Sequence, residues 1–331
     1  MQVKNRTKSS KVSYYCPPTP KMNESEVGVM KDILCALDRS YYLESLGFKL
    51  FNWQREVISS KTRRKCILAS RQAGKSTVVS SIPCHTAKYF PGSTSLILAP
   101  TETQAGLNME KVKDFISMDK TYPKIVRNSD SLLKLENGSK IHVVPATERA
   151  ARGYSKPRCI IIDEASRVED LVYTSGVRPM LTDNPDCELS ILSTPNGKKG
   201  FFYESTNKSY WDRYFIRTPF GVNIDEDGVA GIKTLDEFGL AELTQEMRKR
   251  GIKFFISDRH HSFDEQMENF LEMGMQQYRQ EYLCEFVEPV DNVFSYDDIE
   301  RLATSIGGNF NLPGIDIGAV DNTFDVLEGI I

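Results

Sequence analysis

The sequence of 331 residues has none of the marks of a membrane-spanning chain. It contains no run of about 18 apolar residues, the length that a membrane-spanning helix needs, so we expect no contact with a membrane. No apolar signal-peptide core follows the polar, basic N-terminus. The seven cysteines are scattered, and none has C-x-x-C spacing, which predicts a reducing compartment and no structural zinc.

The sequence also has little net charge. Lysine and arginine number 42 against 45 aspartates and glutamates, a formal net charge of −3. The chain as a whole therefore does not attract nucleic acid, and any such contact has to be local. A hydrophobic fraction of 40% and a charged fraction of 26% are typical of a globular protein. The length favours two domains, or one large domain with an extension.

The most informative stretch is residues 65–77, KCILASRQAGKST. An apolar strand runs into the phosphate-loop pattern G-x-x-x-x-G-K-[ST], except that Ala69 stands where the first glycine should be. Gly74 allows a tight turn that points backbone N–H groups at a triphosphate. Lys75 would reach the β- and γ-phosphates, and Ser76 would bind Mg²⁺ at the start of a helix. The predicted nucleotide-binding residues of the loop are Ala69, Ser70, Arg71, Gln72, Ala73, Gly74, Lys75, Ser76 and Thr77.

Because Gly-Lys-Ser also occurs by chance in loops, this motif needs support, and CIIIDE at residues 159–164 supplies it. The apolar run predicts a strand buried on both faces, as in a parallel sheet. At its carboxyl end Asp163 would hold the Mg²⁺ shell, and Glu164 would orient and polarise the attacking water. The segment alone is also compatible with an exposed acidic turn. The two motifs together predict a P-loop ATPase.

Gln54, with Phe51 three residues earlier, is a candidate for contact with adenine. A side-chain amide offers a donor and an acceptor side by side, which suits an adenine edge. The alternative is the start of an amphipathic helix with Trp53 in the core. Given the phosphate loop, we favour the adenine contact.

Two further segments each have a functional and a structural interpretation. The predicted strand at 188–193 is followed by a Pro-Asn-Gly turn, and Ser193 and Thr194 at this strand end would sense the γ-phosphate if the turn has a function. The basic segment 147–158 is favoured on its own as a solvated loop. The alternative is that Arg149 or Arg152 reaches the ATP of a neighbouring subunit.

Apolar periodicity and turn residues predict the remaining elements. Pro83 should kink or end the helix after the phosphate loop. Thr101 and Gln104 fit a capping box, and Asn137-Gly138 predicts a hairpin, whereas residues 221–231 predict a loop. The predicted helices span 24–60, 235–253 and 270–286, and the predicted strands 95–99, 132–136, 140–144, 188–193 and 211–218.

In this order, ASRQAGKST, CIIIDEAS, STPNG, EYLCEFVEPVDNVFSYDDI and GIDIG resemble the large terminase subunit of tailed bacteriophages, over roughly residues 45–331. The resemblance implies an α/β P-loop NTPase fold of the RecA/ASCE type, with a mostly parallel sheet flanked by helices and a small helical lid. It implies an ATPase, using ATP and Mg²⁺, that translocates double-stranded DNA into a procapsid. The implied partners are double-stranded DNA, the portal protein, the small terminase subunit and further copies of the chain in a ring. The implied location is the host cytoplasm, transiently on the portal.

The resemblance also assigns roles to particular residues. An arginine finger contributes about 10³ to 10⁵ in rate in related enzymes, so its position matters. The family pattern allows Arg71 in cis or Arg152 in trans, and the sequence leaves this choice open. The other implied roles are adenine contact for Gln54, phosphate and Mg²⁺ binding for Lys75 and Ser76, metal-shell acid and catalytic base for Asp163 and Glu164, and coupling for Ser193 and Thr194.

One part of the sequence departs from the family pattern. In the family, a C-terminal nuclease domain with an RNase H-like fold binds two metal ions through several carboxylates. GIDIG at residues 314–318 matches its first strand, and Asp316 its first metal ligand. The residues after Asp316 are too few for the remaining strands, and one carboxylate cannot clamp two metals. We therefore expect this chain to lack nuclease activity, as a truncated, naturally short or split gene product.

These inferences predict an organisation of the chain. They place a flexible basic arm at 1–22, a P-loop ATPase core at 23–218, a lid or linker subdomain at 219–300 and the start of a nuclease domain at 301–331. Local DNA contacts are expected at the basic patches 61–65, 149–158 and 198–199.

Two rival functions remain. A superfamily-2 helicase would need a second RecA-like domain with a Gln- and Arg-rich motif, which 219–331 does not show. A nucleotide-binding scaffold without activity would not need Lys75, Ser76, Asp163 and Glu164.

Overall fold

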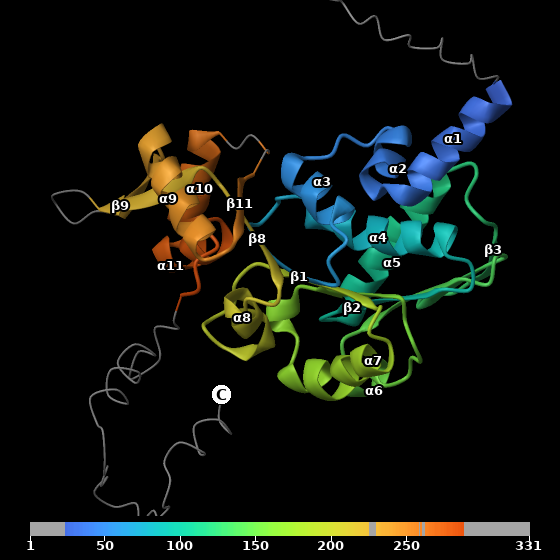
Figure 1. The fold of residues 1–331 in the computed structure, drawn as a ribbon. Helices are drawn as coiled ribbons and strands as arrows, with labels where there is room; N and C mark the ends of the chain where they lie inside the picture. The colour runs from blue at the N-terminus through green and yellow to red at the C-terminus, as the bar shows by residue number, and fades with distance from the viewer. Residues whose placement is uncertain (1–23, 225–229, 258, 260–261, 288–331) are drawn as a thin grey trace, which may run out of the picture.

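The computed structural model describes residues 24–224, 230–257, 259 and 262–287 (Figure 1). The predicted arm at 1–22, the predicted nuclease start at 301–331 and Asp316 lie outside these residues. Within the described part, no helix is both long enough and apolar enough to cross a bilayer.

A nine-stranded sheet forms the centre of the molecule, in the order β11-β8-β1-β7-β6-β2-β5-β4-β3. Neighbouring strands are parallel from β11 to β5, and the β5-β4-β3 edge is antiparallel. The predicted mostly parallel α/β fold is therefore confirmed. The strands are β1 (Arg64–Ala69), β2 (Thr94–Ala99), β3 (Ile125–Asn128), β4 (Leu132–Leu135), β5 (Lys140–Pro145), β6 (Cys159–Asp163), β7 (Glu188–Ser193), β8 (Asp212–Arg217) and β11 (Lys253–Ile256).

Helices cover both faces of this sheet (Figure 1). One face carries α2, α3, α4 and α5, and the opposite face carries α6, α7 and α8. The helices are α1 (Glu24–Leu37), α2 (Arg39–Ser45), α3 (Asn52–Ser59), α4 (Lys75–Tyr89), α5 (Glu102–Met118), α6 (Glu148–Ala151), α7 (Arg178–Asp183), α8 (Gly200–Asn207), α9 (Glu237–Lys249), α10 (Phe263–Met273) and α11 (Met275–Glu281), with short turns η1 (Ala165–Arg167) and η2 (Val172–Val177).

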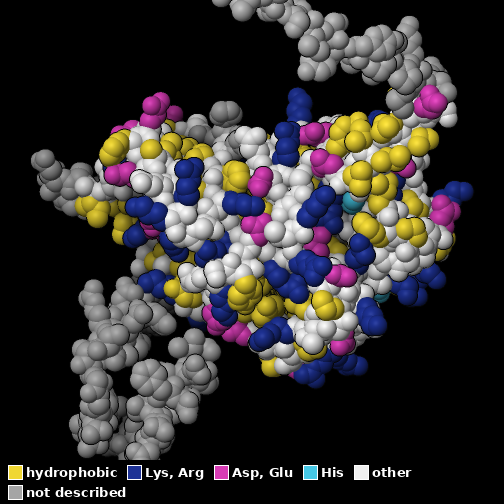
Figure 2. Space-filling model, viewed as in Figure 1, with side chains coloured by type: hydrophobic (Ala, Val, Ile, Leu, Met, Phe, Trp, Pro, Cys, Tyr) yellow, Lys and Arg dark blue, Asp and Glu magenta, His cyan; other side chains and the backbone are white. Residues whose placement is uncertain are grey.

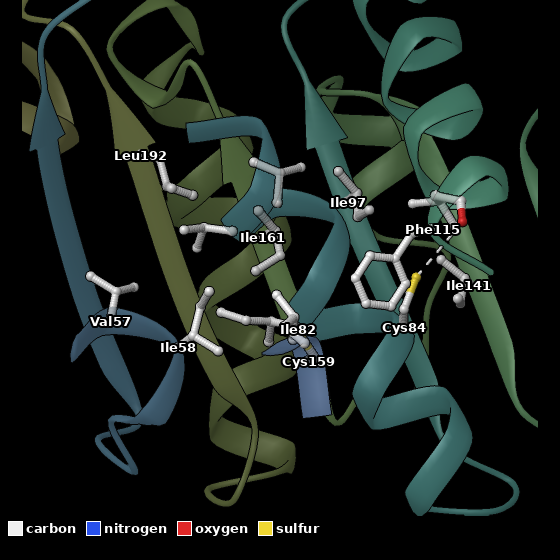
Figure 3. Close-up of a cluster of buried hydrophobic side chains, with 14 of the residues drawn as sticks. Val57, Ile58, Ile82, Cys84, Ile97, Phe115, Ile141, Cys159, Ile161 and Leu192 are labelled. Atoms are coloured by element: carbon white, nitrogen blue, oxygen red, sulfur yellow. Dashed lines mark hydrogen bonds between the residues drawn. The ribbon is translucent and has the colours of Figure 1, made fainter. Parts of the chain in front are cut away.

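Alternate side chains of the central strands enter two different cores. Cys159 and Ile161 of β6 join the cluster under α3, α4 and α5, whereas Ile160 and Ile162 join the cluster on the other face. Figure 3 shows the first cluster, in which Ile161 lies among Ile82 of α4 and Ile97 of β2. Because both faces are covered, β6 is buried along its whole length, as its uninterrupted apolar sequence predicts.

The helix after the phosphate loop does not end at Pro83. Of the two alternatives expected at Pro83, the end of the helix was wrong, because α4 continues to Tyr89, and the kink stays a prediction. The residues of α4 from Val78 to Ala87 are all buried between the sheet and the neighbouring helices. Burial on every side holds the helix together although the proline cannot donate its backbone hydrogen bond.

Other predicted boundaries also change. The expected helix at 24–60 is three helices, and Asp38 caps α2 by accepting from the backbone of Ser40 and Tyr41. Gly274 divides the expected helix at 270–286 into α10 and α11. The expected loop at 221–231 contains strand residues instead, because β9 (Phe220–Ile224) pairs with β10 (Ala230–Thr234).

One local prediction is confirmed in part and one in full. The Thr101 hydroxyl caps α5 by accepting from the backbone N–H of Gln104 at 3.1 Å, which is the N-cap half of the predicted capping box. The turn at Asn137-Gly138 joins β4 and β5, which pair antiparallel.

β9, β10, α10 and α11 lie together at one side of the sheet (Figure 1). They contribute to a small apolar cluster of their own, which contains Phe220, Ile232, Phe270 and Tyr278. However, β11 pairs with β8 and so extends the large sheet. The predicted boundary after residue 218 therefore does not separate two independent sheets.

The N-terminal helix α1 leaves apolar side chains on the surface. Figure 2 shows hydrophobic side chains gathered where α1 lies, at the upper right. Those with more than two fifths of their surface exposed are Val27, Val29, Met30, Ile33, Leu34 and Leu37.

Candidate nucleotide-binding site

The strand order brings the predicted motifs to one edge of the sheet. β7 lies between β1 and β6, and all three strands are parallel. The phosphate loop after β1, Thr194 after β7 and Glu164 after β6 therefore meet at the carboxyl edge, where ligands bind in such sheets. A cleft of about 710 Å³ lies there, lined by Arg71, Gln72, Ala73, Gly74, Lys75, Ser76, Pro100, Thr101, Gln104, Glu164, Arg167, Thr194, Arg259 and Glu281.

The phosphate loop has the backbone that its glycine predicts. Gly74 adopts φ +95°, a left-handed conformation, and immediately precedes α4. A Cβ at this position would lie 2.8 Å from Nε2 of Gln54, so a side chain has neither the space nor the backbone freedom. The first residues of α4, Lys75 and Ser76, line the cleft, and a helix N-terminus at this place suits an anion.

The departure at Ala69 has a structural explanation. Ala69 is the last residue of β1 and pairs with β8, so it has the extended backbone of a strand. This conformation needs no glycine. Its carbonyl accepts from Lys75 Nζ at 3.0 Å, and the Ser70 carbonyl accepts from the same ammonium at 3.2 Å. Lys75 thus lies folded over the loop from which it would reach a phosphate.

Asp163 is buried at the end of β6, with 6% of its surface exposed. Its Oδ2 accepts from Asn108 Nδ2 at 2.9 Å, and its Oδ1 accepts from the backbone of Glu164 at 3.1 Å. Burial raises the pKa of Asp163, while the Asn108 hydrogen bond and the charges of Lys75 and Lys111 act in the opposite direction.

Glu164 follows with a backbone that is unusual for its residue type. It adopts φ +47°, in the left-handed region that costs a non-glycine residue free energy. The carboxylate accepts from Ser193 Oγ at 3.0 Å. Ser193 Oγ also lies 2.7 Å from Ser166 Oγ. The end of β7 thus contacts the acid directly, through the serine predicted for coupling, and Thr194 lines the cleft beside it.

Gln54 contacts the phosphate loop. Its Nε2 donates to the Gly74 carbonyl at 2.9 Å, and its Oε1 accepts from the backbone of Phe51 at 3.0 Å. The side chain is buried, and both ends of its amide contact backbone. α3 begins at Asn52 and Trp53 is fully buried, as the alternative interpretation expected. The adenine contact stays a prediction.

The two candidate arginine fingers lie in different places. Arg71 lines the cleft, and its backbone N–H donates to the Glu281 carbonyl at 2.7 Å. Arg152 follows α6, forms an ion pair with Glu148 and does not line the cleft of its own chain. Its side chain is 59% exposed, so it is accessible to another molecule.

The sequence analysis missed several residues at the site. Asn108 contacts Asp163, and Lys111 Nζ donates to Ser76 Oγ at 3.1 Å. Arg259 Nη1 donates to the Gln72 carbonyl at 2.9 Å, and Arg167 lies 3.6 Å from Glu281. The sequence offers one clue to these residues, because Asn108 is a polar residue within the apolar stripe of α5. No local pattern marks Arg259 as a residue of the site.

The donor set fits Mg²⁺ held together with a nucleotide. Ser76 and Asp163 would supply hard oxygen ligands, which Mg²⁺ prefers. Among the described residues, no group of three or more His, Cys, Asp or Glu side chains is placed to hold a metal alone. This suits an ion that takes its remaining ligands from phosphate and water. The cations Arg71, Lys75, Arg167 and Arg259 line the same cleft and match a triphosphate.

Comparison with known proteins points to one family. Residues 66–301 match the family model described as "Terminase large subunit, T4likevirus-type, N-terminal". The chain is 27% identical over 179 residues to the large terminase subunit of Thermus phage G20c, and 28% identical over 180 residues to that of Thermus virus P23-45. Each match covers 49% of this chain and 37% of the relative's length.

A solved structure supports the fold. The ATPase domain of the large terminase of Thermus phage P74-26 matches with a TM-score of 0.54 and 22% identity. The match covers 74% of this chain and 97% of that chain. The predicted P-loop fold and the predicted resemblance are both confirmed.

Proposed function

This chain belongs to the terminase large-subunit family, and on that premise we propose that it hydrolyses ATP to drive double-stranded DNA into a viral procapsid. The main support is the meeting of three strand ends at one cleft. The phosphate loop, the Ser193 hydroxyl and the Asp163-Glu164 pair come from neighbouring parallel strands. The 3.0 Å hydrogen bond from Ser193 to Glu164 joins two of these ends directly.

Each side chain then has a role that its position allows. Lys75 and the start of α4 would bind the β- and γ-phosphates, and Arg71 would add positive charge at the same cleft. Ser76 and Asp163 would hold Mg²⁺, which neutralises charge on the transferred phosphoryl group. Glu164 would accept a proton from, or orient, the attacking water.

Ser193 would report the state of the site to β7. Its hydroxyl lies between Glu164 and Ser166, so any movement of the Glu164 carboxylate changes this hydrogen bond. Because β7 pairs with β1 and β6 along its length, the change would reach both other strands. We keep Ser193 and Thr194 as the proposed coupling residues.

The proposed partners are double-stranded DNA, the portal protein, the small terminase subunit and further copies of this chain in a ring, in the host cytoplasm. On the face shown in Figure 2, Lys and Arg side chains are spread among acidic ones. Because Lys and Arg side chains neutralise phosphates, DNA binding through the patches 61–65, 149–158 and 198–199 would be independent of sequence and weakened by salt.

Family membership argues against the helicase alternative. The expectation of no nuclease activity rests on Asp316 and its surroundings, which lie outside the described residues, and it stays a prediction.

The test is steady-state ATP hydrolysis by the full chain over a range of protein concentrations. We expect a rate per subunit that rises with concentration, and a loss of about 10² to 10⁴ in rate for Glu164→Gln. Glu169→Gln is the matched control, because Glu169 is exposed and outside the cleft. Binding of ATP without turnover under every condition would favour the scaffold instead.

Mixing variants decides between the arginines. If Arg152 acts in trans, Arg152→Ala and Glu164→Gln should regain activity when combined, because mixed assemblies contain one intact site. If instead Arg71 acts in cis, Arg71→Ala should be inactive alone and should not recover with Glu164→Gln, because neither chain then carries a complete site. Arg152→Ala should keep its activity in that case.

A further inference from the structure

Helix α5 reaches both residues that are proposed to bind the metal. Asn108 hydrogen-bonds Asp163 at the end of β6, and Lys111 hydrogen-bonds Ser76 in the first turn of α4. Residues three positions apart lie on one face of a helix. One face of α5 therefore bridges the two elements that carry the metal's protein ligands.

Asn108 is poorly explained as a packing residue. It is 1% exposed, and its Oδ1 is buried without a hydrogen-bond donor in the described part of the chain. A buried acceptor without a partner costs stability, and an apolar residue of similar size would avoid this cost. What Asn108 provides is a donor to Asp163, since a carboxylate can only accept. The hydrogen bond fixes the orientation of that carboxylate.

Lys111 places a positive charge on the hydroxyl that the metal would need. Its Nζ lies 3.1 Å from Ser76 Oγ. A metal ion bound to the same oxygen would lie within a few ångströms of the ammonium, and the two cations would repel each other. Lys111 is partly exposed, so its long side chain can leave the hydroxyl without disturbing the core.

We propose that Asn108 and Lys111 are positioning residues with opposite effects on metal binding. Asn108 holds Asp163 ready for the ion, and Lys111 occupies Ser76 until the ion displaces it. Displacement breaks one of the two hydrogen bonds described above between α5 and the motifs, so the arrival of the metal with its nucleotide is transmitted to α5. This inference rests on the proposed function, because it assumes that the cleft binds a metal–nucleotide complex.

The test measures metal affinity rather than activity. Full-length protein is titrated with Mn²⁺ in the presence of ADP, and free Mn²⁺ is followed by electron paramagnetic resonance. We expect Lys111→Met to bind Mn²⁺ about tenfold more tightly, because a nearby like charge is removed. Lys111→Arg keeps the charge and should behave as the parent. Lys113→Met is the matched control on the same helix, because Lys113 has no contact with either motif in the described structure.

Asn108→Leu should act in the other direction. Loss of a residue that orients a metal ligand weakens metal binding by about 10-fold to 100-fold in known sites. The substitution removes the unpaired Asn108 acceptor but also leaves the buried Asp163 carboxylate without its donor, so the Mn²⁺ affinity decides and the melting temperature reports the balance of these two effects. A lower melting temperature together with unchanged Mn²⁺ affinity would mean that Asn108 is structural only, and would overturn its part of the proposal.

The outcomes separate this inference from the proposed function. Parent and Lys111→Met binding Mn²⁺–ADP equally would overturn the inference and leave the nucleotide site intact. Weaker binding by Lys111→Met would overturn it too, since Lys111 would then help to hold the nucleotide. Failure of the parent to bind ADP with or without Mn²⁺ would overturn both.

Discussion

β1 and β7 lie side by side, and their two ends meet very different chemistry. At the amino ends, the buried Lys65 pairs with the partly buried Glu188, and Arg39 donates to both oxygens of Glu188 at 2.8 and 2.7 Å. At the carboxyl ends, charged groups face a cleft, Glu164 has a strained backbone and Asn108 keeps an unpaired acceptor. At the amino ends the charged side chains pair with one another, whereas at the carboxyl ends charged side chains line a cleft that a ligand can enter.

The difference teaches where the sheet gains stability and where it gains function. Burial alone would raise the pKa of Glu188, but the charges of Arg39 and Lys65 lower it to about 2. Burial raises the pKa of Asp163, and its partners do not overcome this. A carboxylate stabilised in the folded protein contributes to folding, whereas one left short of partners is available for a cation.

The largest effect should come from breaking the amino end. Glu188→Gln leaves the buried charges of Arg39 and Lys65 without their carboxylate, so we expect a loss of about 3 to 5 kcal/mol in the free energy of unfolding. Glu204→Gln is the control, because Glu204 pairs with Lys208 on the surface and should change stability by less than about 1 kcal/mol. Denaturant unfolding of both variants checks this. Equal losses would refute the contrast between the two sheet ends.

The same cluster should give a pH dependence that the variant lacks. The folded-state pKa of Glu188 is about 2, below its ordinary value of 4.5. The ionised carboxylate therefore stabilises the fold above about pH 4.5, and this contribution, about 3 kcal/mol, is lost as the pH falls toward 2. The difference in unfolding free energy between parent and Glu188→Gln should shrink on acidification. A difference that stays constant from pH 6 to pH 3 would contradict this assignment.

The two ends also differ in how far the sequence predicts them. β6 was predictable because an uninterrupted apolar run marks a strand covered on both faces, and β1 was predictable because apolar residues 66–68 precede the phosphate loop. Asp163 and Ser193 end their strands, and Lys75 stands in the phosphate-loop pattern that follows β1. Local sequence thus determines them.

What the sequence did not predict depends on tertiary packing. Lys111 reaches Ser76 only because α5 packs beside α4, and Arg259 reaches the phosphate loop from a distant part of the chain. Pro83 looked like a helix end, but burial outweighed its local preference. The amino-end cluster joins Arg39 and Glu188, which no short-range pattern connects.

A smaller effect should distinguish two roles for Gln54. Its amide holds the Gly74 carbonyl, so Gln54→Leu should lower the affinity for ATP and GTP by a similar factor, about tenfold for one lost buried hydrogen bond. Competition binding with both nucleotides measures this. Loss of ATP affinity alone would instead support the adenine contact predicted from the sequence. Glu56→Gln, at an exposed position of α3 that pairs with Lys253, controls for changes in this helix.

The smallest expected effect is a gain in the free energy of unfolding, opposite in sign to the loss expected for Glu188→Gln. Asp163 is buried with a raised pKa, so at neutral pH its charge costs folding free energy that an amide would not. Asp163→Asn keeps an acceptor for Asn108 and should raise the unfolding free energy by about 1 kcal/mol, while Mn²⁺–ADP binding is lost. Thermal melting and metal titration of one sample check both. Because this stabilisation comes from charge, it should shrink as acid protonates the parent carboxyl, whose pKa is raised above the ordinary value of an aspartate. A variant that loses stability as well as metal binding would show that the carboxyl end, like the amino end, is built to hold the sheet together.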